Sequence, residues 1–194
     1  MIFSGAAAMK LFSLTSIFSF SAILLLAGCA SLPETLKSDS PRLISDYQAW
    51  SVQTTADGTP IRLGGVIAAV TNLDNKTRIE VVNLPISESG KPDIDKEPHG
   101  RFVGYIDGFI DPVTFAKGRM VTLLGTSQGT EQEKVGDYDY RFPVMQISGY
   151  HLWRVEERVV TYDDPFFYPC IGIYCRHLYY DYGPREGKVI KTVK

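Results

Sequence analysis

The stretch Arg62-Leu63-Gly64-Gly65-Val66-Ile67-Ala68-Ala69-Val70 gives the clearest indication of the fold. Its aliphatic residues favour a β-strand, and a glycine inside such a stretch usually marks a bulge or a sharp bend in a barrel. A turn is expected at 73–76, and residues 78–84 then alternate apolar with polar side chains up to Pro85, as a half-buried strand does. The two stretches therefore predict a β-hairpin.

Further strands are expected where β-branched and aromatic residues lie between turn residues. These stretches are 101–110, 118–125, 144–155 with Trp153 near its end, and an additional first strand at 49–54. The acidic, polar residues 130–137 predict a hairpin tip. Between the strands expected at 101–110 and 118–125, residues 113–117 leave room for one helical turn with Asp111 as its cap.

These elements together predict an all-β fold. Five strands, or six with 49–54, a brief helix between the third and fourth, and glycines at the bends indicate a small OB-like barrel of five to six strands. A β-sandwich is the alternative. After residue 160 the chain is rich in Tyr, Phe and Pro without helical or strand periodicity, which predicts an irregular aromatic tail.

The N-terminal region carries an uncharged run from Leu11 to Leu26 that follows Lys10 and ends at Leu26-Ala27-Gly28-Cys29. A short apolar run after a positive charge, closed by small residues, is typical of a secretory signal peptide. The stretch resembles the lipobox of bacterial lipoproteins, which implies cleavage between Gly28 and Cys29 and lipid on the Cys29 thiol. An uncleaved membrane anchor over 11–30 is the alternative, but four serines and Thr15 interrupt the run.

Lipidation has physical consequences for where the mature chain resides. Two or more acyl chains such as palmitate, at about 0.8 kcal/mol per buried methylene, hold a protein almost permanently to a bilayer. Ala30, rather than Asp, follows the cysteine, which resembles lipoproteins sorted to the outer membrane of Gram-negative bacteria. We therefore expect a chain anchored by lipid to the outer membrane and facing the periplasm. Met9 is a better start than Met1, because Lys10 then directly precedes the apolar run.

The chain divides by composition into four parts. They are a lipoprotein signal peptide (1–28), a tether (29–45), a β-barrel domain (46–160) and an aromatic, cysteine-containing tail (161–194). The last residues, 185–194, are polar and basic, which predicts a frayed end. The formal net charge is −2, so the surface gives no electrostatic footprint for nucleic acid.

Two cysteines of the tail, Cys170 and Cys175, are separated by four residues. In an oxidising periplasm they most simply form a disulfide. A zinc site with His177 is the alternative, but it shows three ligands where structural sites have four. The surrounding aromatic rings are expected to pack on the barrel, since aromatic residues mostly serve burial; a belt that touches lipid or sugar is the other interpretation.

A series of short motifs in order along the chain resembles one protein family, the Slp family of starvation-inducible outer-membrane lipoproteins. These motifs are Arg62-x-Gly64-Gly65, Glu80-Val81-x-x-Leu84-Pro85, Gly90-Lys91-Pro92-Asp93, Gly100-Arg101-Phe102, Gly108-Phe109-Ile110-Asp111-Pro112, Gly118-Arg119-x-Val121-Thr122-x-x-Gly125 and Tyr150-His151-Leu152-Trp153. The resemblance implies an envelope protein of stressed or starved Gram-negative bacteria. It implies no enzyme activity, so no catalytic residue or cofactor is carried over.

Two other patterns in the sequence suggest an enzyme or a metal site. Gly125-Thr126-Ser127-Gln128-Gly129 fits G-x-S-x-G, and Asp137 and His151 follow in the chain order of an α/β-hydrolase. A nucleophile elbow needs a strand-to-helix turn over a parallel sheet, which the predicted β-hairpin does not offer. The acidic loop 93–99 lacks the glycine and glutamate of an EF-hand, so no dedicated metal site is predicted.

The sequence therefore predicts a non-catalytic outer-membrane lipoprotein that acts through an envelope protein or the membrane surface. The alternative is a periplasmic module that binds a small ligand or glycan on the barrel face and aromatic tail. A serine hydrolase is the third hypothesis.

Overall fold

The computed structural model describes residues 31–52, 57–161 and 187–194, and all of these except Ser31 belong to one compact unit. The helices of this unit are short and most of its strands are long. The elements are η2 (Glu34–Leu36), α2 (Tyr47–Val52), β1 (Pro60–Asn72), β2 (Lys76–Leu84), β3 (Gly100–Asp107), β4 (Met120–Val135), β5 (Tyr138–Trp153), β6 (Val155–Thr161) and β7 (Gly187–Val193). Of the helices in the described ranges, none has both the length and the apolar character needed to cross a bilayer.

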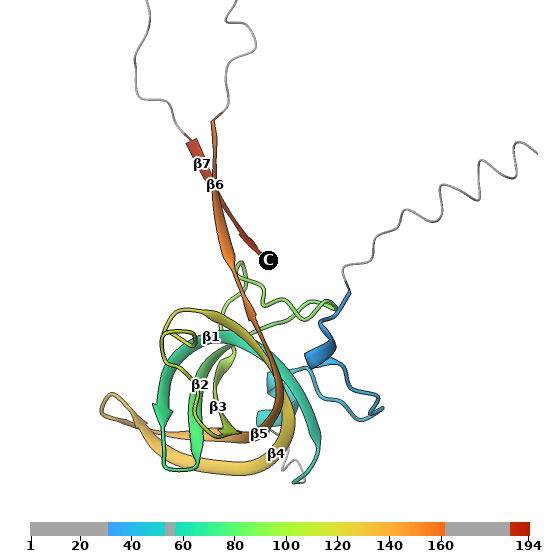
Figure 1. The fold of residues 1–194 in the computed structure, drawn as a ribbon, viewed down its shortest axis with the longest axis vertical. Coiled ribbons are helices and arrows are strands. Elements are labelled where there is room, and N and C mark those ends of the chain that lie inside the picture. Colours follow the sequence, from blue (N-terminus) through green and yellow to red (C-terminus); the bar gives the residue numbers. More distant parts are fainter. Residues whose placement is uncertain (1–30, 53–56, 162–186) are drawn as a thin grey trace, which may run out of the picture. The chain divides into compact units, whose positions relative to one another are not determined.

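Five strands close into a barrel in the order β1-β2-β3-β5-β4 (Figure 1). Every neighbouring pair is antiparallel except β3 and β5, which run parallel over a short register beginning at Val103 and Val144. β4 pairs with β1 and thereby closes the ring. The predicted all-β fold and the predicted β1–β2 hairpin are confirmed.

The interior of the barrel is filled by side chains from alternate positions of the strands. In β2, Thr77, Ile79 and Val81 are fully buried, whereas Arg78 and Glu80 lie on the outer face. The main core includes Ile61, Leu63, Ile67, Ile79, Val81, Phe102, Val121, Leu123, Met145 and Ile147. A period of two in burial is what a sheet with one covered face produces.

The glycine pair of β1 allows close approach of the neighbouring strand. A Cβ on Gly65 would lie 1.9 Å from the carbonyl oxygen of Val82 in β2. The predicted bulge occurs a few residues later, where the β1–β2 register shifts between Ile67 and Ala69. Gly125 lies at a second register shift, in β4, and a Cβ there would lie 2.1 Å from the oxygen of Gln146.

The strand predicted at 49–54 is wrong for 49–52, because α2 covers Tyr47–Val52; residues 53 and 54 lie outside the described residues. Asp46 precedes this helix, and its Oδ1 accepts a hydrogen bond of 2.7 Å from the Ala49 amide, as an N-cap does. Tyr47 and Trp50 are buried in the main core. The burial of Tyr47 and Trp50 against the barrel therefore outweighs the strand propensity of their side chains.

The connection between β3 and β4 is a capped turn. β3 ends at Asp107, earlier than predicted, and Gly108 follows with a φ of 83°. Asp111 Oδ1 accepts from the Val113 amide at 2.9 Å, and the Phe115 amide donates to the Asp111 carbonyl at 3.0 Å. The predicted cap at Asp111 is confirmed, whereas the predicted helix is limited to this turn.

The hairpin of β4 and β5 is longer than the sequence indicated. Both strands continue through the residues predicted as an acidic tip, with Glu131 opposite Phe142, and the chain turns only at Gly136 and Asp137. We call the part of this hairpin from Thr130 to Phe142 the β4–β5 ribbon. Most of the predicted tip is therefore paired strand.

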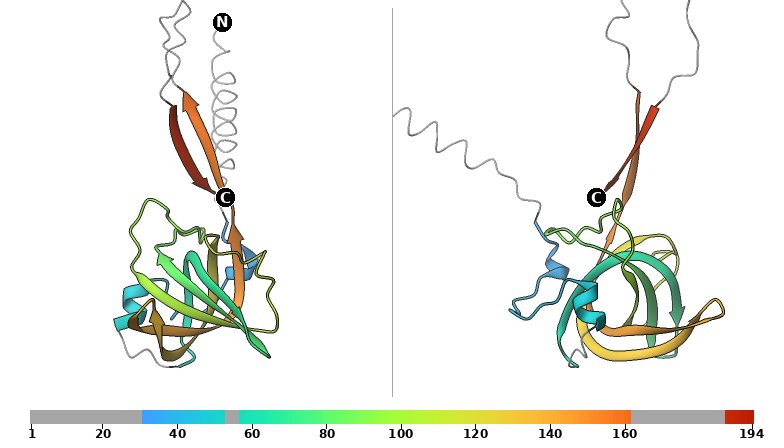
Figure 2. Two further views of the ribbon diagram at one scale, coloured as in Figure 1. Left: turned by 90° about the vertical axis from the view of Figure 1, so that its left-hand side faces the viewer. Right: turned by 180° about the vertical axis from the view of Figure 1, so that it is seen from behind.

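The prediction of a frayed end at 185–194 is wrong for 187–193, because these residues form β7. β7 pairs with β6 along its whole length as a separate two-stranded sheet (Figure 2). Two backbone hydrogen bonds of 2.7 Å join Arg154 to Lys194. Val193 packs on a second cluster of buried residues that contains Leu36 and Trp153, so Leu36, in the segment predicted as a tether, contacts the barrel domain.

Candidate functional site

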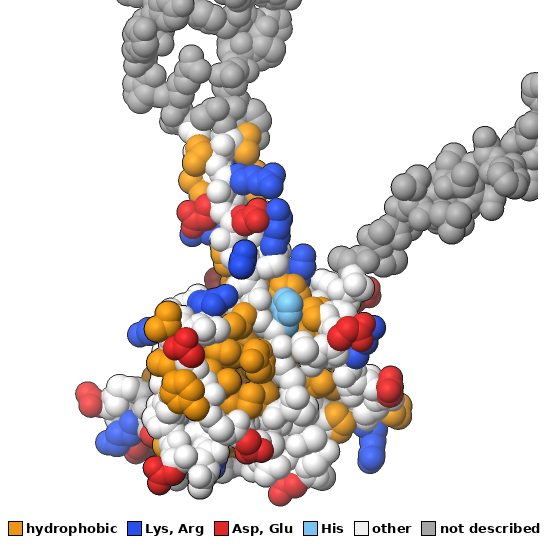
Figure 3. All heavy atoms as spheres, viewed as in Figure 1, with side chains coloured by type: hydrophobic (Ala, Val, Ile, Leu, Met, Phe, Trp, Pro, Cys, Tyr) orange, Lys and Arg blue, Asp and Glu red, His pale blue; other side chains and the backbone are white. Residues whose placement is uncertain are grey.

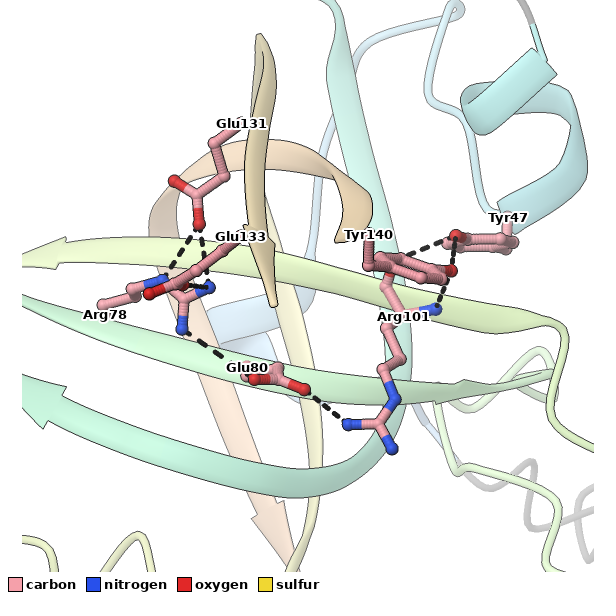
Figure 4. A network of polar contacts seen from close by, with 7 residues as sticks. All are labelled: Tyr47, Arg78, Glu80, Arg101, Glu131, Glu133 and Tyr140. Carbon is pink, nitrogen blue, oxygen red and sulfur yellow. Dashed lines mark hydrogen bonds and ion pairs between the residues drawn. The ribbon is translucent and has the colours of Figure 1, made fainter. Parts of the chain in front are cut away.

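The outer face of β2 and β3 carries an arrangement of charged residues that we call the Arg78 cluster (Figure 4). Its members are Arg78, Glu80, Arg101, Glu131 and Glu133. The β4–β5 ribbon brings Glu131 and Glu133 over β2, where Arg78 Nη2 lies 2.8 Å from Glu131 Oε1 and 2.6 Å from Glu133 Oε2. Arg78 Nε also donates to Glu131 at 2.9 Å, and Glu80 pairs with Arg101.

The Arg78 guanidinium is the centre of this cluster. Its side chain is only 12% exposed, and its Cζ lies 5.5 Å from the centre of the Phe142 ring. Burial lowers the pKa of Arg78, but the hydrogen bond and charge of Glu131 and the charge of Glu133 outweigh burial and raise it. The ion pairs therefore compensate the desolvation of the arginine.

Two tyrosines extend the cluster toward α2. The Tyr140 hydroxyl accepts from the Arg101 amide at 3.2 Å, and the Tyr47 hydroxyl donates to the Arg101 carbonyl at 2.9 Å. Burial, and then the neighbouring Tyr140, raise the pKa of Tyr47. Tyr105 donates to Glu131 at 2.8 Å, and burial together with Glu131 raises its pKa. The arginines, glutamates and tyrosines of this face thus form hydrogen bonds and ion pairs with one another or with the neighbouring backbone.

A groove of about 370 Å³ lies beside the Arg78 cluster and is called the basic groove below. Its apolar lining comes mainly from Val66 and Ala68 on the outer face of β1, Val82 on the outer face of β2 and Val135 of the ribbon. Arg101, Lys117 and Lys134 lie around this lining, together with Glu80. Lys117 and Lys134 are exposed and form no ion pair with any residue that the structure describes. The groove therefore combines an apolar surface with uncompensated positive charge.

The residues of the hydrolase hypothesis lie far apart. Ser127 is buried and accepts a hydrogen bond of 3.1 Å from Trp50 Nε1. Ser127 pairs with Met145 on β5, six residues from His151, which corresponds to roughly 20 Å along a strand. Asp137 lies in the turn at the far end of the ribbon. The three side chains do not form a triad in this structure.

The acidic loop 93–99 and His151 have local structural contacts. The Asp95 amide donates to Asp93 Oδ1 at 3.0 Å, whereas Glu97 and His99 are exposed. Within the described ranges, no three His, Cys, Asp or Glu side chains gather as a metal site would require. The His151 ring packs edge-on against Trp153 with the ring centres 4.3 Å apart, and burial lowers its pKa.

The sites predicted with covalent chemistry lie outside the described residues. They are Gly28 and Cys29 at the signal cleavage and lipidation site, and Cys170 and Cys175 of the predicted disulfide. His177 and the aromatic tail from Tyr162 also lie there. The lipid and the disulfide stay predictions.

The sequence profile described as "Outer membrane lipoprotein Slp family" matches residues 26–186. The chain belongs to the Slp family of outer membrane lipoproteins. The resemblance predicted from the short motifs is thereby confirmed, and the family supports an outer-membrane location.

Relatives of the chain cover most of its length. It is 33% identical to the uncharacterized lipoprotein YeaY of Escherichia coli (strain K12) over 87% of this chain and 91% of YeaY. It is 32% identical to the outer membrane protein Slp of the same strain, over 71% of this chain and 73% of that protein. An uncharacterized protein of Haemophilus influenzae (strain ATCC 51907 / DSM 11121 / KW20 / Rd) is 36% identical over 72% and 75% of the two chains.

The Arg78 cluster was missed in the sequence. Its charges alternate with apolar residues along β2, whereas on β4 the polar Gln132 separates Glu131 from Glu133. This spacing puts each set on one face of a strand, which normally means a solvated face. Only the fold shows that the two faces meet.

Proposed function

We propose that this member of the Slp family is a non-catalytic binding module, anchored to the outer membrane by lipid on Cys29 and facing the periplasm. In this proposal the signal peptide is cleaved between Gly28 and Cys29. The domain then acts during starvation or envelope stress through contact with an envelope protein or with the membrane surface.

The proposal depends most on the Arg78 cluster. The strand order, the parallel β3–β5 pair and the capped turn between β3 and β4 support an OB-like barrel. OB-like barrels usually bind ligands on strands 2 and 3 and the adjoining loops. Here the β4–β5 ribbon covers that face, and Arg78 is 12% exposed between two carboxylates. The chain's own ribbon therefore fills the face where an OB-like barrel would bind a ligand. This favours a module that makes contact through its remaining outer surface over one that encloses a substrate.

The basic groove supports a second candidate, a site for an anionic envelope glycan or small ligand. Its exposed Lys117 and Lys134 attract an anion, and Val66 and Val82 offer apolar contact. Substitution of both lysines by alanine would then weaken binding of an anionic glycan, measured by calorimetry. Equal affinities of the variant and the parent chain would contradict this candidate.

Photocrosslinking in cells tests the proposal. A photoreactive residue is placed at exposed Lys134, with exposed Gln132 on the same ribbon as a second position and exposed Lys188 of β7 as a distant one. We expect one position to yield a discrete product with an envelope protein or with lipid, more strongly in starved cells. The absence of any product from the three positions, in growing and in starved cells, would contradict a contact function for these surfaces.

A further inference from the structure

Three large apolar side chains are exposed on the two loops at one end of the barrel. Leu73, in the β1–β2 turn, is 46% exposed, and Phe109 and Val113, in the β3–β4 connection, are 73% and 81% exposed. We call these three residues the apolar tip. Hydrophobic side chains also gather over the middle of the barrel face that Figure 1 presents (Figure 3), whereas the apolar tip is defined by the exposure of its three residues alone. Exposed apolar groups that lie together usually mark a contact surface.

Hydrogen bonds fix the two loops to each other. The Thr77 hydroxyl is fully buried, lies 2.6 Å from Asn72 Oδ1 and 2.9 Å from the Gly108 carbonyl, and accepts from the Ile110 amide at 3.1 Å. Asn72 Nδ2 donates to the Ile110 carbonyl at 3.1 Å. The tip is therefore presented by ordered loops, so docking orders little additional backbone.

The charges on the same loops balance. They are the basic Lys76, Lys117 and Arg119 and the acidic Asp74, Asp107 and Asp111. Several are already engaged: Lys76 lies 3.9 Å from the centre of the Tyr105 ring, and Asp111 caps the turn. A surface of this kind favours a partner through apolar contact, with little dependence on salt.

We propose that the apolar tip docks into the interfacial region of a phospholipid bilayer. This inference rests on the proposed lipid anchor. The family is located at the outer membrane, and an anchored domain meets the bilayer at high effective concentration, so a few apolar side chains suffice for contact. Phe109 and Leu73 are of the residue types that interfacial segments bury at the boundary between headgroups and acyl chains, and the balanced charges suit a largely zwitterionic surface.

Fluorescence in reconstituted vesicles tests the docking. The full lipid-bearing chain with Phe109→Trp is placed in vesicles of phosphatidylethanolamine and phosphatidylglycerol, with and without brominated acyl chains. Val159→Trp, at a valine of β6 that is 67% exposed, is the matched control, and both variants keep the buried Trp50 and Trp153. We expect brominated lipid to reduce the added emission at least twofold at position 109, independently of salt, and to leave position 159 unchanged.

Three other results of the vesicle experiment would contradict the docking. An anchored chain whose indole at 109 emits as in water and is not quenched overturns the docking and leaves the lipid anchor intact. A blue shift that depends on protein concentration, without quenching, means that the tip packs on a second copy and also overturns it. A chain that does not stay with the vesicles overturns the lipid anchor and the docking together.

Discussion

Substitution of Arg78 by methionine tests whether the Arg78 cluster holds the β4–β5 ribbon on the barrel. Methionine keeps an unbranched apolar chain next to Phe142 but removes the guanidinium. Glu131 then loses its hydrogen bond and ion pair with Arg78, and Glu133 loses its ion pair. Glu80 keeps Arg101 as its partner.

The expected loss follows from the burial of each partner. A hydrogen bond to a charged group contributes about 1.5–3 kcal/mol when it is protected from water. Glu131 is 25% exposed and falls in this range, whereas Glu133 is 58% exposed, so its pair contributes at most about 1 kcal/mol. We expect Arg78→Met to lower the free energy of unfolding by about 3 kcal/mol, which corresponds to a fall in Tm of roughly 10 °C.

Urea unfolding followed by tryptophan fluorescence measures this change, because Trp50 and Trp153 are both buried. Arg141→Met is the matched control: Arg141 is exposed on the same ribbon and should change stability by less than about 0.5 kcal/mol. The double variant Arg78→Met with Glu131→Gln should recover part of the loss, since it leaves no unpaired carboxylate at Glu131. A loss below about 0.5 kcal/mol for Arg78→Met would refute the structural role of the cluster.

Three further predictions concern the barrel. Gly65→Ala places a methyl group against the Val82 carbonyl and should cost about 3 kcal/mol or more in urea unfolding; a variant as stable as the parent would contradict the close approach of β1 and β2. Ser127→Ala removes the acceptor for Trp50 Nε1 and should cost about 1 kcal/mol, while a fluorophosphonate probe should leave Ser127 unlabelled in the parent chain; an adduct would revive the hydrolase hypothesis. Burial lowers the pKa of His151, so its contribution to stability is fully present above pH 6.5 and is lost as the pH falls through the lower folded-state pKa; an imidazole titration midpoint at or above 6.5 by NMR would contradict its burial.

The barrel was predictable from the sequence because its signals are local. The glycine pair at 64–65 and the alternation along 78–84 predict neighbouring strands joined by a tight turn. Asp111 is a residue type that caps the turn that follows it. Each of these depends on residues within a few positions of one another. The same local rules favour a strand at 49–54, although Asp46 is also an N-cap residue that predicts a helix start.

The remaining features depend on partners distant in the chain. β7 pairs with β6 only after an intervening segment of the chain, so the lysines of 188–194 looked like those of a frayed end. Arg78 meets Glu131 across 53 positions, and no local pattern indicates that this face is covered. Non-local pairing of this kind appears only once the strands are placed, which is why the candidate site was less predictable than the barrel.

Mass spectrometry of the mature N-terminal peptide, prepared from the chain isolated from bacterial outer membranes, decides whether the chain is a lipoprotein. We expect a peptide that begins at Cys29 and carries a diacylglyceryl group on the sulfur and an acyl chain on the amine. A peptide with a free Cys29 thiol, or with residues before Cys29 still attached, would contradict this expectation.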